Sequence, residues 1–137
     1  MEWAARIFSS DLQQLAEMRA FVRDVCRRTW GVAAGDEALA QLDLAMSEAA
    51  ANVIRHAYRG EAGRPIEVIV DADADRVCVG LYHEGIEFDP ASVPPPVFDG
   101  TREGGFGLYL MAQCLDEVIH TDDGKGRRGV RLVKIRK

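Results

Sequence analysis

Two hydrophobic periods follow one another along the chain. Apolar residues recur every three or four positions over 11–30 and again over 36–58, which predicts two helices that end near Gly31 and Gly60. Segments that alternate in polarity or are rich in β-branched residues are typical of strands. The predicted strands span 2–10, 64–73, 75–84, 118–123 and 129–137.

The start of the first helix and the long loop carry more specific signals. Ser10 followed by Gln13 fits a capping box, so the first helix is expected to begin directly after Ser10.

A third helix is predicted over 105–118, after an irregular stretch with three consecutive prolines, Pro94 to Pro96. Prolines exclude helix and central strand there, and a loop this long in a compact domain is usually functional. We therefore expect a lid over 89–103.

The order of these elements indicates the architecture. A strand, two helices, a hairpin, a loop, a helix and a closing hairpin segregate the helices from the strands. The expected fold class is α+β, a two-layer sandwich with the helices on one face of a mostly antiparallel sheet. The sequence has no internal repeat and no linker-like boundary, so residues 1–137 are expected to form one domain.

Composition narrows the function classes. The formal net charge of −5 argues against nucleic acid as a direct partner, because a phosphate backbone calls for a clustered basic surface. The N-terminus lacks a secretory pattern and no apolar run could span a bilayer, so we expect a cytoplasmic protein without a membrane partner. The cysteines, Cys26, Cys78 and Cys114, lie far apart in apolar stretches and are expected to be small buried thiols.

The second helix carries polar groups at the flank of its apolar face. At about 100° per residue, Glu48 and Asn52 lie one turn apart on this flank. A carboxylate can accept a proton from a hydroxyl. An amide oxygen is a neutral ligand for Mg²⁺, which takes waters and phosphate oxygens as its other ligands. The alternative is an incidental pair at a solvated helix edge.

A glycine-rich segment begins the third helix. Gly104, Gly105 and Gly107 lie where the irregular stretch turns into the helix, next to Leu108. Glycines let backbone N–H groups approach an anion closely, and a helix N-terminus adds a favourable dipole. The segment therefore predicts a phosphate-binding turn, with a flexible hinge as the alternative. Together with the acid–amide helix and the proline-rich loop, it favours a nucleotide site.

The same segments resemble a known family. Residues 42–58 resemble the N box of the anti-sigma-factor serine/threonine protein kinases, a branch of the gyrase, chaperone and histidine-kinase (GHKL) ATPase superfamily. Residues 82–90 resemble their G1 box, 104–118 their G2 box and 129–137 their closing strand, so the resemblance covers nearly the whole chain.

The resemblance implies a fold, an activity and partners. It implies the Bergerat sandwich, with ATP and Mg²⁺ bound under a mobile lid. The activity would be phosphorylation of a serine on a STAS-domain anti-anti-sigma protein, which regulates a sigma factor by partner switching. A homodimer is also expected from the resemblance.

Site residues follow from the same match. Glu48 falls on the catalytic base of the family and Asn52 on its Mg²⁺ ligand. The cofactor-binding positions are Asn52, His83, Gly85, Gly104, Gly105, Gly107 and Leu108.

Two positions depart from the family pattern. His83 stands where the G1 box has an aspartate that reads the adenine amino group, and Arg128 stands where the family has a threonine. A neutral imidazole lacks the charge that makes hydrogen bonds to a carboxylate about twice as strong. A second interpretation therefore stays open, a partner-switch module that keeps the fold and binds nucleotide weakly or not at all. A fragment of a histidine-phosphorylating sensor kinase is disfavoured, because no upstream helix pair with an acceptor histidine is present.

Overall fold

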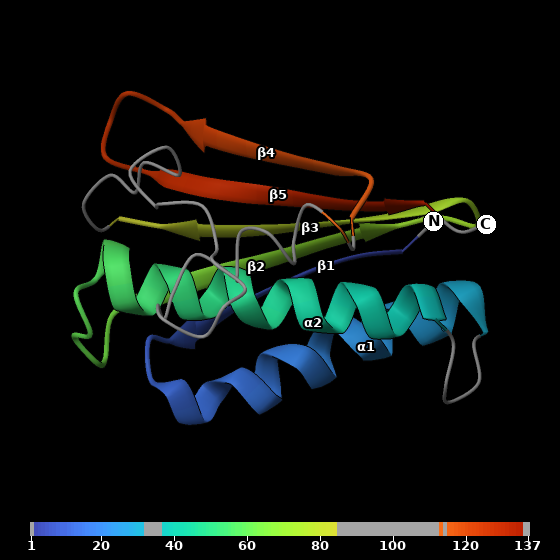
Figure 1. The fold of residues 1–137 in the computed structure, drawn as a ribbon, viewed down its shortest axis with the longest axis horizontal. Helices are drawn as coiled ribbons and strands as arrows, with labels where there is room; N and C mark the ends of the chain where they lie inside the picture. The colour runs from blue at the N-terminus through green and yellow to red at the C-terminus, as the bar shows by residue number, and fades with distance from the viewer. Residues whose placement is uncertain (1, 32–36, 85–112, 114, 136–137) are drawn as a thin grey trace, which may run out of the picture.

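Two helices of the protein lie against one face of a five-stranded sheet (Figure 1). The computed structural model describes residues 2–31, 37–84, 113 and 115–135. The strands are β1 (Glu2–Ser9), β2 (Pro65–Ala72), β3 (Arg76–His83), β4 (Glu117–Asp122) and β5 (Arg128–Ile135). The helical segments are α1 (Leu15–Trp30), α2 (Glu37–Asn52), a 3₁₀ turn (Leu12–Gln14) and a π-helical turn (Val53–Ala57) that continues α2. No helix in these described ranges is long and apolar enough to cross a membrane.

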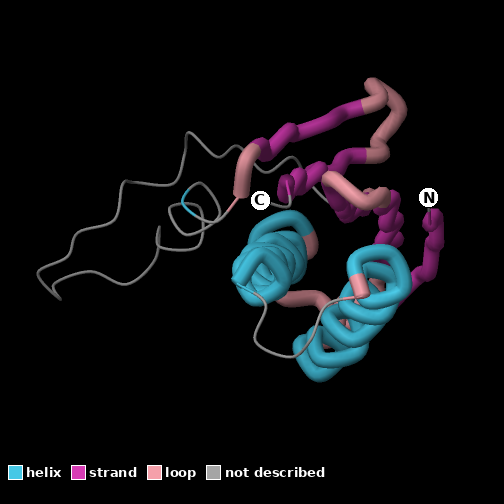
Figure 2. The backbone as a smooth tube through the Cα atoms, turned by 90° about the vertical axis from the view of Figure 1, so that its right-hand side faces the viewer, coloured by secondary structure: helices cyan, strands magenta, loops and turns pink. Residues whose placement is uncertain are grey.

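The described strands pair antiparallel in the order β1, β2, β3, β5, β4. Viewed from the side, the two helices stand together on one side of the strands (Figure 2). The β2–β3 hairpin is closed by Asp73, whose carboxylate accepts hydrogen bonds from the backbone N–H groups of Asp75 and Arg76. The α+β two-layer sandwich predicted from the sequence is confirmed.

The core forms where strand alternation and helical spacing face each other. On the helix side of the sheet, Val68, Val79 and Leu81 are fully buried. The helices meet them with buried residues spaced three or four apart: Met18, Val22, Val25, Leu42, Met46, Ala49 and Val53. Each large apolar side chain removed from water in this way stabilises the fold by about 1.5–3 kcal/mol. The spacings of apolar residues that predicted strands and helices from the sequence are therefore also the spacings of the buried residues in this core.

The opposite, outer face of the sheet presents part of its apolar surface to solvent. Trp3 and Ile7 of β1 are each 64% exposed. The other tryptophan, Trp30, is buried at the end of α1, and its Nε1 donates a hydrogen bond to the Asp73 carbonyl at 2.8 Å. This bond ties the end of α1 to the β2–β3 turn.

The first helix begins later than the predicted capping box, because Ser10 is engaged by a distant part of the chain. The buried Ser10 hydroxyl donates to the Glu61 carbonyl at 2.7 Å and accepts the Arg64 N–H at 2.9 Å. The N-cap positions belong instead to Asp11, before the 3₁₀ turn, and to Gln14, before α1, which starts only at Leu15. The prediction of a capping box at Ser10 is wrong.

Several other boundaries can be compared with the sequence. Gly31 and Gly60 have positive φ angles of 59° and 78° just after the helical segments, as expected for residues that end helices. β4 begins at Glu117, so the third helix predicted over 105–118 does not extend to its predicted end. Gln113 is helical, whereas Leu115 and Asp116 are not. Residues 105–112 and 114 of that predicted helix and the predicted lid lie outside the described residues. Cys26 and Cys78 are buried free thiols, as expected, and Cys114 also lies outside the described residues.

Candidate functional site

A cavity of about 190 Å³ lies between α2 and one end of the sheet. Among the described residues, its helical wall includes Ala49, Asn52 and Val53. Its strand wall includes His83, His120, Thr121, Asp122, Arg128, Gly129 and Val130. Asn52 and His83, which were predicted separately from two motifs, therefore line the same cavity from opposite layers.

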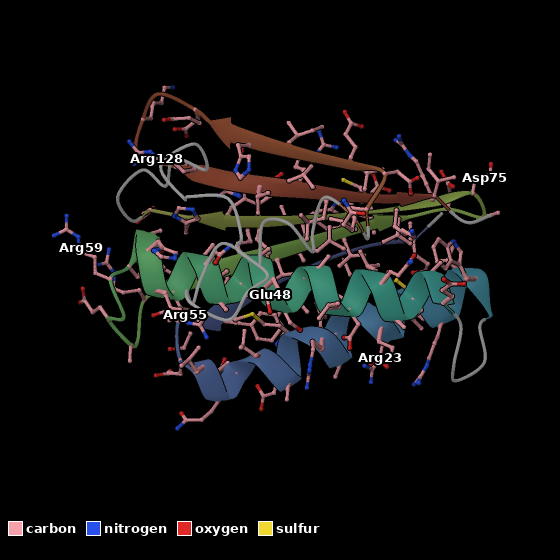
Figure 3. The ribbon with its side chains drawn as sticks, in the orientation of Figure 1. Arg23, Glu48, Arg55, Arg59, Asp75 and Arg128 are labelled. Atoms are coloured by element: carbon pink, nitrogen blue, oxygen red, sulfur yellow. The ribbon has the colours of Figure 1, made fainter. Side chains whose placement is uncertain are left out.

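The helical wall is built around the last turn of α2. Asn52 is the final α-helical residue and is half-buried. Glu48, also half-buried, lies one turn earlier, about 6 Å along the helix axis. In Figure 3 it lies near the middle of the continuous helical run that α2 forms with the π-helical turn, and it is not among the residues that line the cavity. The predicted base therefore stands beside the cavity wall and the predicted metal ligand within it.

His83, the last residue of β3, is the most buried polar side chain of the strand wall. It is only 7% exposed, and within the described part of the chain its Nδ1 has no hydrogen-bond partner. Burial, and then the charge of Arg128, lower the pKa of His83 from 6.5 to about 4. The imidazole is thus neutral at neutral pH, with one N–H donor and one acceptor nitrogen. A buried nitrogen without a partner is costly, so a ligand that supplies one would be favoured here.

A row of three polar residues crosses the strand wall. His83 pairs in register with Arg128 of β5, which in turn pairs with Asp122 of β4. The Arg128 Nε lies 3.3 Å from the Asp122 carboxylate, so the two opposite charges offset each other beside the cavity. Figure 3 shows Arg128 at the start of β5, on the sheet layer, across from the helices. The strand wall therefore joins a neutral imidazole to an ion pair.

The next question is which of the described residues could bind a metal ion. No cluster of three or more His, Cys, Asp or Glu that could hold a metal occurs in the ranges that the structure describes. The amide oxygen of Asn52 suits Mg²⁺, which commonly takes only one or two protein ligands and fills its octahedron with phosphates and waters. The other predicted cofactor-binding residues, Gly85, Gly104, Gly105, Gly107 and Leu108, lie outside the described residues.

Sequence reasoning missed most of the strand wall. His120, Thr121 and Asp122 lie at the end of β4 and were predicted only as part of a strand. A signal was available, since the closing hairpin pairs this strand with the one that starts at Arg128. Because hairpin register places the residues nearest the turn opposite each other, Arg128 pointed to Asp122 as a neighbour.

Comparison with known families decides what kind of domain surrounds this cavity. The family model of the histidine kinase-like ATPase domain matches residues 8–134. The chain belongs to the histidine kinase-like ATPase family. The GHKL resemblance inferred from the N, G1 and G2 boxes is thereby confirmed at the level of the family.

Serine-protein kinases of Bacillus species resemble the chain over different lengths. The serine-protein kinase RsbW of Bacillus cereus strain AH187 is 30% identical over 122 residues, which are 82% of this chain and 73% of that protein. The serine-protein kinase RsbW of Bacillus licheniformis is 34% identical over 93 residues, 61% of this chain and 58% of that protein. The protein of the same name from Bacillus subtilis is 34% identical over 85 residues, and the chain spans 53% of its length.

Proposed function

We propose that this ATPase-family chain is a serine protein kinase that binds ATP with Mg²⁺ in the cavity. Its substrate is a serine of a STAS-domain anti-anti-sigma protein, and it regulates a sigma factor by partner switching. The main observation in support of the proposal is that Asn52 of α2 and His83 of β3 line the same cavity. The similarity to serine-protein kinases supports the reaction type.

The proposed roles follow the chemistry of each side chain. Phosphoryl transfer depends mainly on positioning and charge neutralisation. The Asn52 amide oxygen would hold Mg²⁺, which would supply positive charge to offset that of the phosphates. Gly104, Gly105 and Gly107, with Leu108, would cradle the phosphates, and His83 and Gly85 would face the base.

Glu48 is proposed as the general base of the transfer. The acceptor serine oxygen bonds to the γ-phosphorus while the bond from that phosphorus to the β–γ bridging oxygen breaks. The serine proton passes to the Glu48 carboxylate, and ADP leaves with the bridging oxygen. A half-buried carboxylate one turn from Asn52 is suited to this role, because proton transfer requires a base beside the reacting hydroxyl.

Titration with ATP and Mg²⁺ while thermal unfolding is followed tests the proposal. A ligand at a hundred times its dissociation constant stabilises the native state by about 2.7 kcal/mol, which is readily measured. ADP should stabilise as well, because it shares the base and most of the phosphate contacts. Absence of a shift with either nucleotide would favour the partner-switch module, which acts by binding alone. The neutral His83 beside Arg128 is the observation that supports this second candidate.

Restoring a carboxylate should strengthen adenine binding. In His83→Asp, the new carboxylate can accept from the adenine amino group, and the neighbouring Arg128 helps to keep it ionised. Because hydrogen bonds to a charged acceptor are about twice as strong as neutral ones, ATP and ADP should bind roughly tenfold tighter. Calorimetric titration measures the change, and inorganic triphosphate, which lacks the base, is the control ligand. Unchanged or weaker ATP binding would show that this position no longer contacts adenine.

A further inference from the structure

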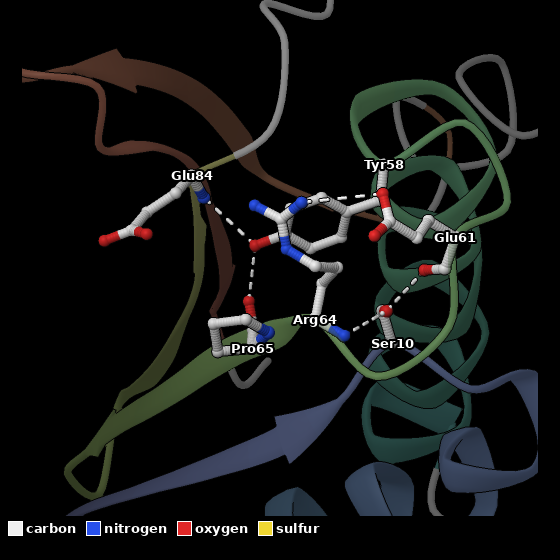
Figure 4. Close-up of polar contacts among 6 residues, drawn as sticks. All are labelled: Ser10, Tyr58, Glu61, Arg64, Pro65 and Glu84. Carbon is white, nitrogen blue, oxygen red and sulfur yellow. Dashed lines mark hydrogen bonds and ion pairs between the residues drawn. The ribbon is translucent and has the colours of Figure 1, made fainter.

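The hydroxyl of Tyr58 joins two strands just outside the cavity (Figure 4). It donates a hydrogen bond to the carbonyl of Pro65, at 2.5 Å, and accepts one from the backbone N–H of Glu84, at 3.0 Å. Pro65 is the first residue of β2, and Glu84 directly follows His83 at the end of β3. One side-chain oxygen therefore connects the start of one strand with the exit of its neighbour.

The position of this hydroxyl is unusual with respect to the β2–β3 ladder. The last register pair at this end is Glu67 with Tyr82, and the same register continued by two residues would place Pro65 opposite Glu84. In an antiparallel ladder, the Glu84 N–H would then donate directly to the Pro65 carbonyl. The Tyr58 oxygen instead stands between the two groups and accepts from one while it donates to the other. The hydroxyl thus replaces a ladder bond and keeps the two strand ends apart.

The ring of the same residue contacts His83, which lines the cavity. Tyr58 is 3% exposed, and its ring meets the His83 imidazole edge to face, with centroids 5.8 Å apart and an interplanar angle of 76°. The guanidinium of Arg64 lies over the Tyr58 ring, 5.0 Å from its centroid. Since both ring and hydroxyl are engaged, Tyr58 has little freedom to move and so gives His83 a rigid support.

The π-helical turn brings Tyr58 to this place. The Tyr58 N–H donates to the Val53 carbonyl, five residues back, at 2.9 Å, where an α-helix would use the residue four back. A π turn takes up one residue more than an α turn, so it changes the direction of the side chain that follows. π turns are rare and are found frequently at functional sites.

We propose that Tyr58 is the positioning residue of the candidate site, because its inserted hydroxyl and its ring together hold His83 against the cavity and direct the chain as it leaves β3. The affinity part of this inference rests on the proposed function, since it assumes that the cavity binds ATP. The structural part, that the hydroxyl sets the environment of the imidazole, does not depend on that assumption.

Tyr58→Phe tests the inference, because it keeps the ring and removes only the inserted oxygen. ATP with Mg²⁺ should bind about tenfold more weakly to the full chain, since small displacements of a binding group are costly. The NMR resonances of the His83 imidazole should shift as well. Tyr82→Phe is the matched control: Tyr82 precedes His83 in β3, and its ring packs over Gly80 and Gly129. That variant should change neither the affinity nor the His83 resonances.

The outcomes separate this inference from the proposed function. Wild-type affinity and unshifted His83 resonances in Tyr58→Phe would overturn the inference, even if the protein were less stable. If wild-type protein binds no ATP, the proposed function fails, and the His83 resonances alone decide the role of Tyr58. Should Tyr58→Phe fail to fold, an amide-to-ester change at the His83–Glu84 bond removes the donated N–H without adding bulk beside the Tyr58 oxygen, which keeps its bond to Pro65. The same shift of the His83 resonances is expected from it, and its absence would count against the inference.

Discussion

Glu48→Gln is expected to abolish phosphoryl transfer while leaving ATP binding nearly intact. The change keeps the size of the side chain and removes the carboxylate that would accept the serine proton. General bases contribute about 10²–10⁴-fold to rate, so single-turnover phosphorylation of a cognate STAS-domain protein should fall by that factor. Calorimetric affinity for ATP should remain close to wild type, because Glu48 does not line the cavity.

Two companion variants make this result specific. Ser47→Ala alters the neighbouring residue, whose hydroxyl donates to the Asp43 carbonyl of the same helix at 2.9 Å, and should leave turnover unchanged. Asn52→Ala removes the proposed Mg²⁺ ligand and should weaken the binding of ATP with Mg²⁺ itself. Near wild-type turnover in Glu48→Gln would show that another group accepts the proton.

Acid is expected to destabilise the protein through His83. The pKa of this buried imidazole is lowered from 6.5 to about 4, so between these values the unfolded chain binds a proton that the folded chain does not. The free energy of unfolding therefore rises with pH across this window, and the contribution is lost as pH falls from 6.5 toward 4. A shift of this size corresponds to about 3 kcal/mol, since each pKa unit is worth about 1.4 kcal/mol.

Urea unfolding of wild type and His83→Asn at a series of pH values measures this contribution. Other titrating groups near the cavity, such as Asp122 and His120, are present in both proteins, so the difference between the two curves isolates His83. The difference should be flat above pH 6.5 and should fall below it. Parallel curves would mean that the imidazole is hydrated in the folded protein and takes up its proton as readily as in the unfolded chain.

The sequence predicted the elements well because their signals are local. Alternation such as that of the residues around Val68 reports which face of a strand is buried, and burial in β2 alternates accordingly. The residues around Val79 predicted a strand through their β-branched and apolar character instead, and β3 is buried on both faces there. The helical spacing of Leu42, Met46 and Ala49 likewise predicted the buried face of α2. These patterns depend on residues a few positions apart, which single-sequence reasoning can compare directly.

Contacts between residues far apart in the sequence could not be predicted from the sequence pattern. Ser10 resembled a helix cap because its partner Glu61 is 51 residues away. The role of Tyr58 depends on Glu84, 26 residues away, and on a π turn whose sequence has an ordinary helical pattern. Asn52 and His83 could be predicted as site residues, but the cavity that they share results from the packing of α2 on the sheet. The roles of Glu48, Asn52 and His83 stay predictions.

The unequal environments of the two tryptophans provide an optical readout for the experiments above. Trp3→Phe would leave Trp30 as the single indole, and its fluorescence should move to longer wavelength only when α1 separates from the sheet and water reaches the ring. In Figure 3, Asp75, in the turn that Trp30 contacts, and Arg128, at the cavity, lie at opposite ends of the molecule. Occupation of the cavity should therefore leave the emission of the folded protein unchanged, so that stability can be followed by fluorescence in the presence of nucleotide without interference from binding.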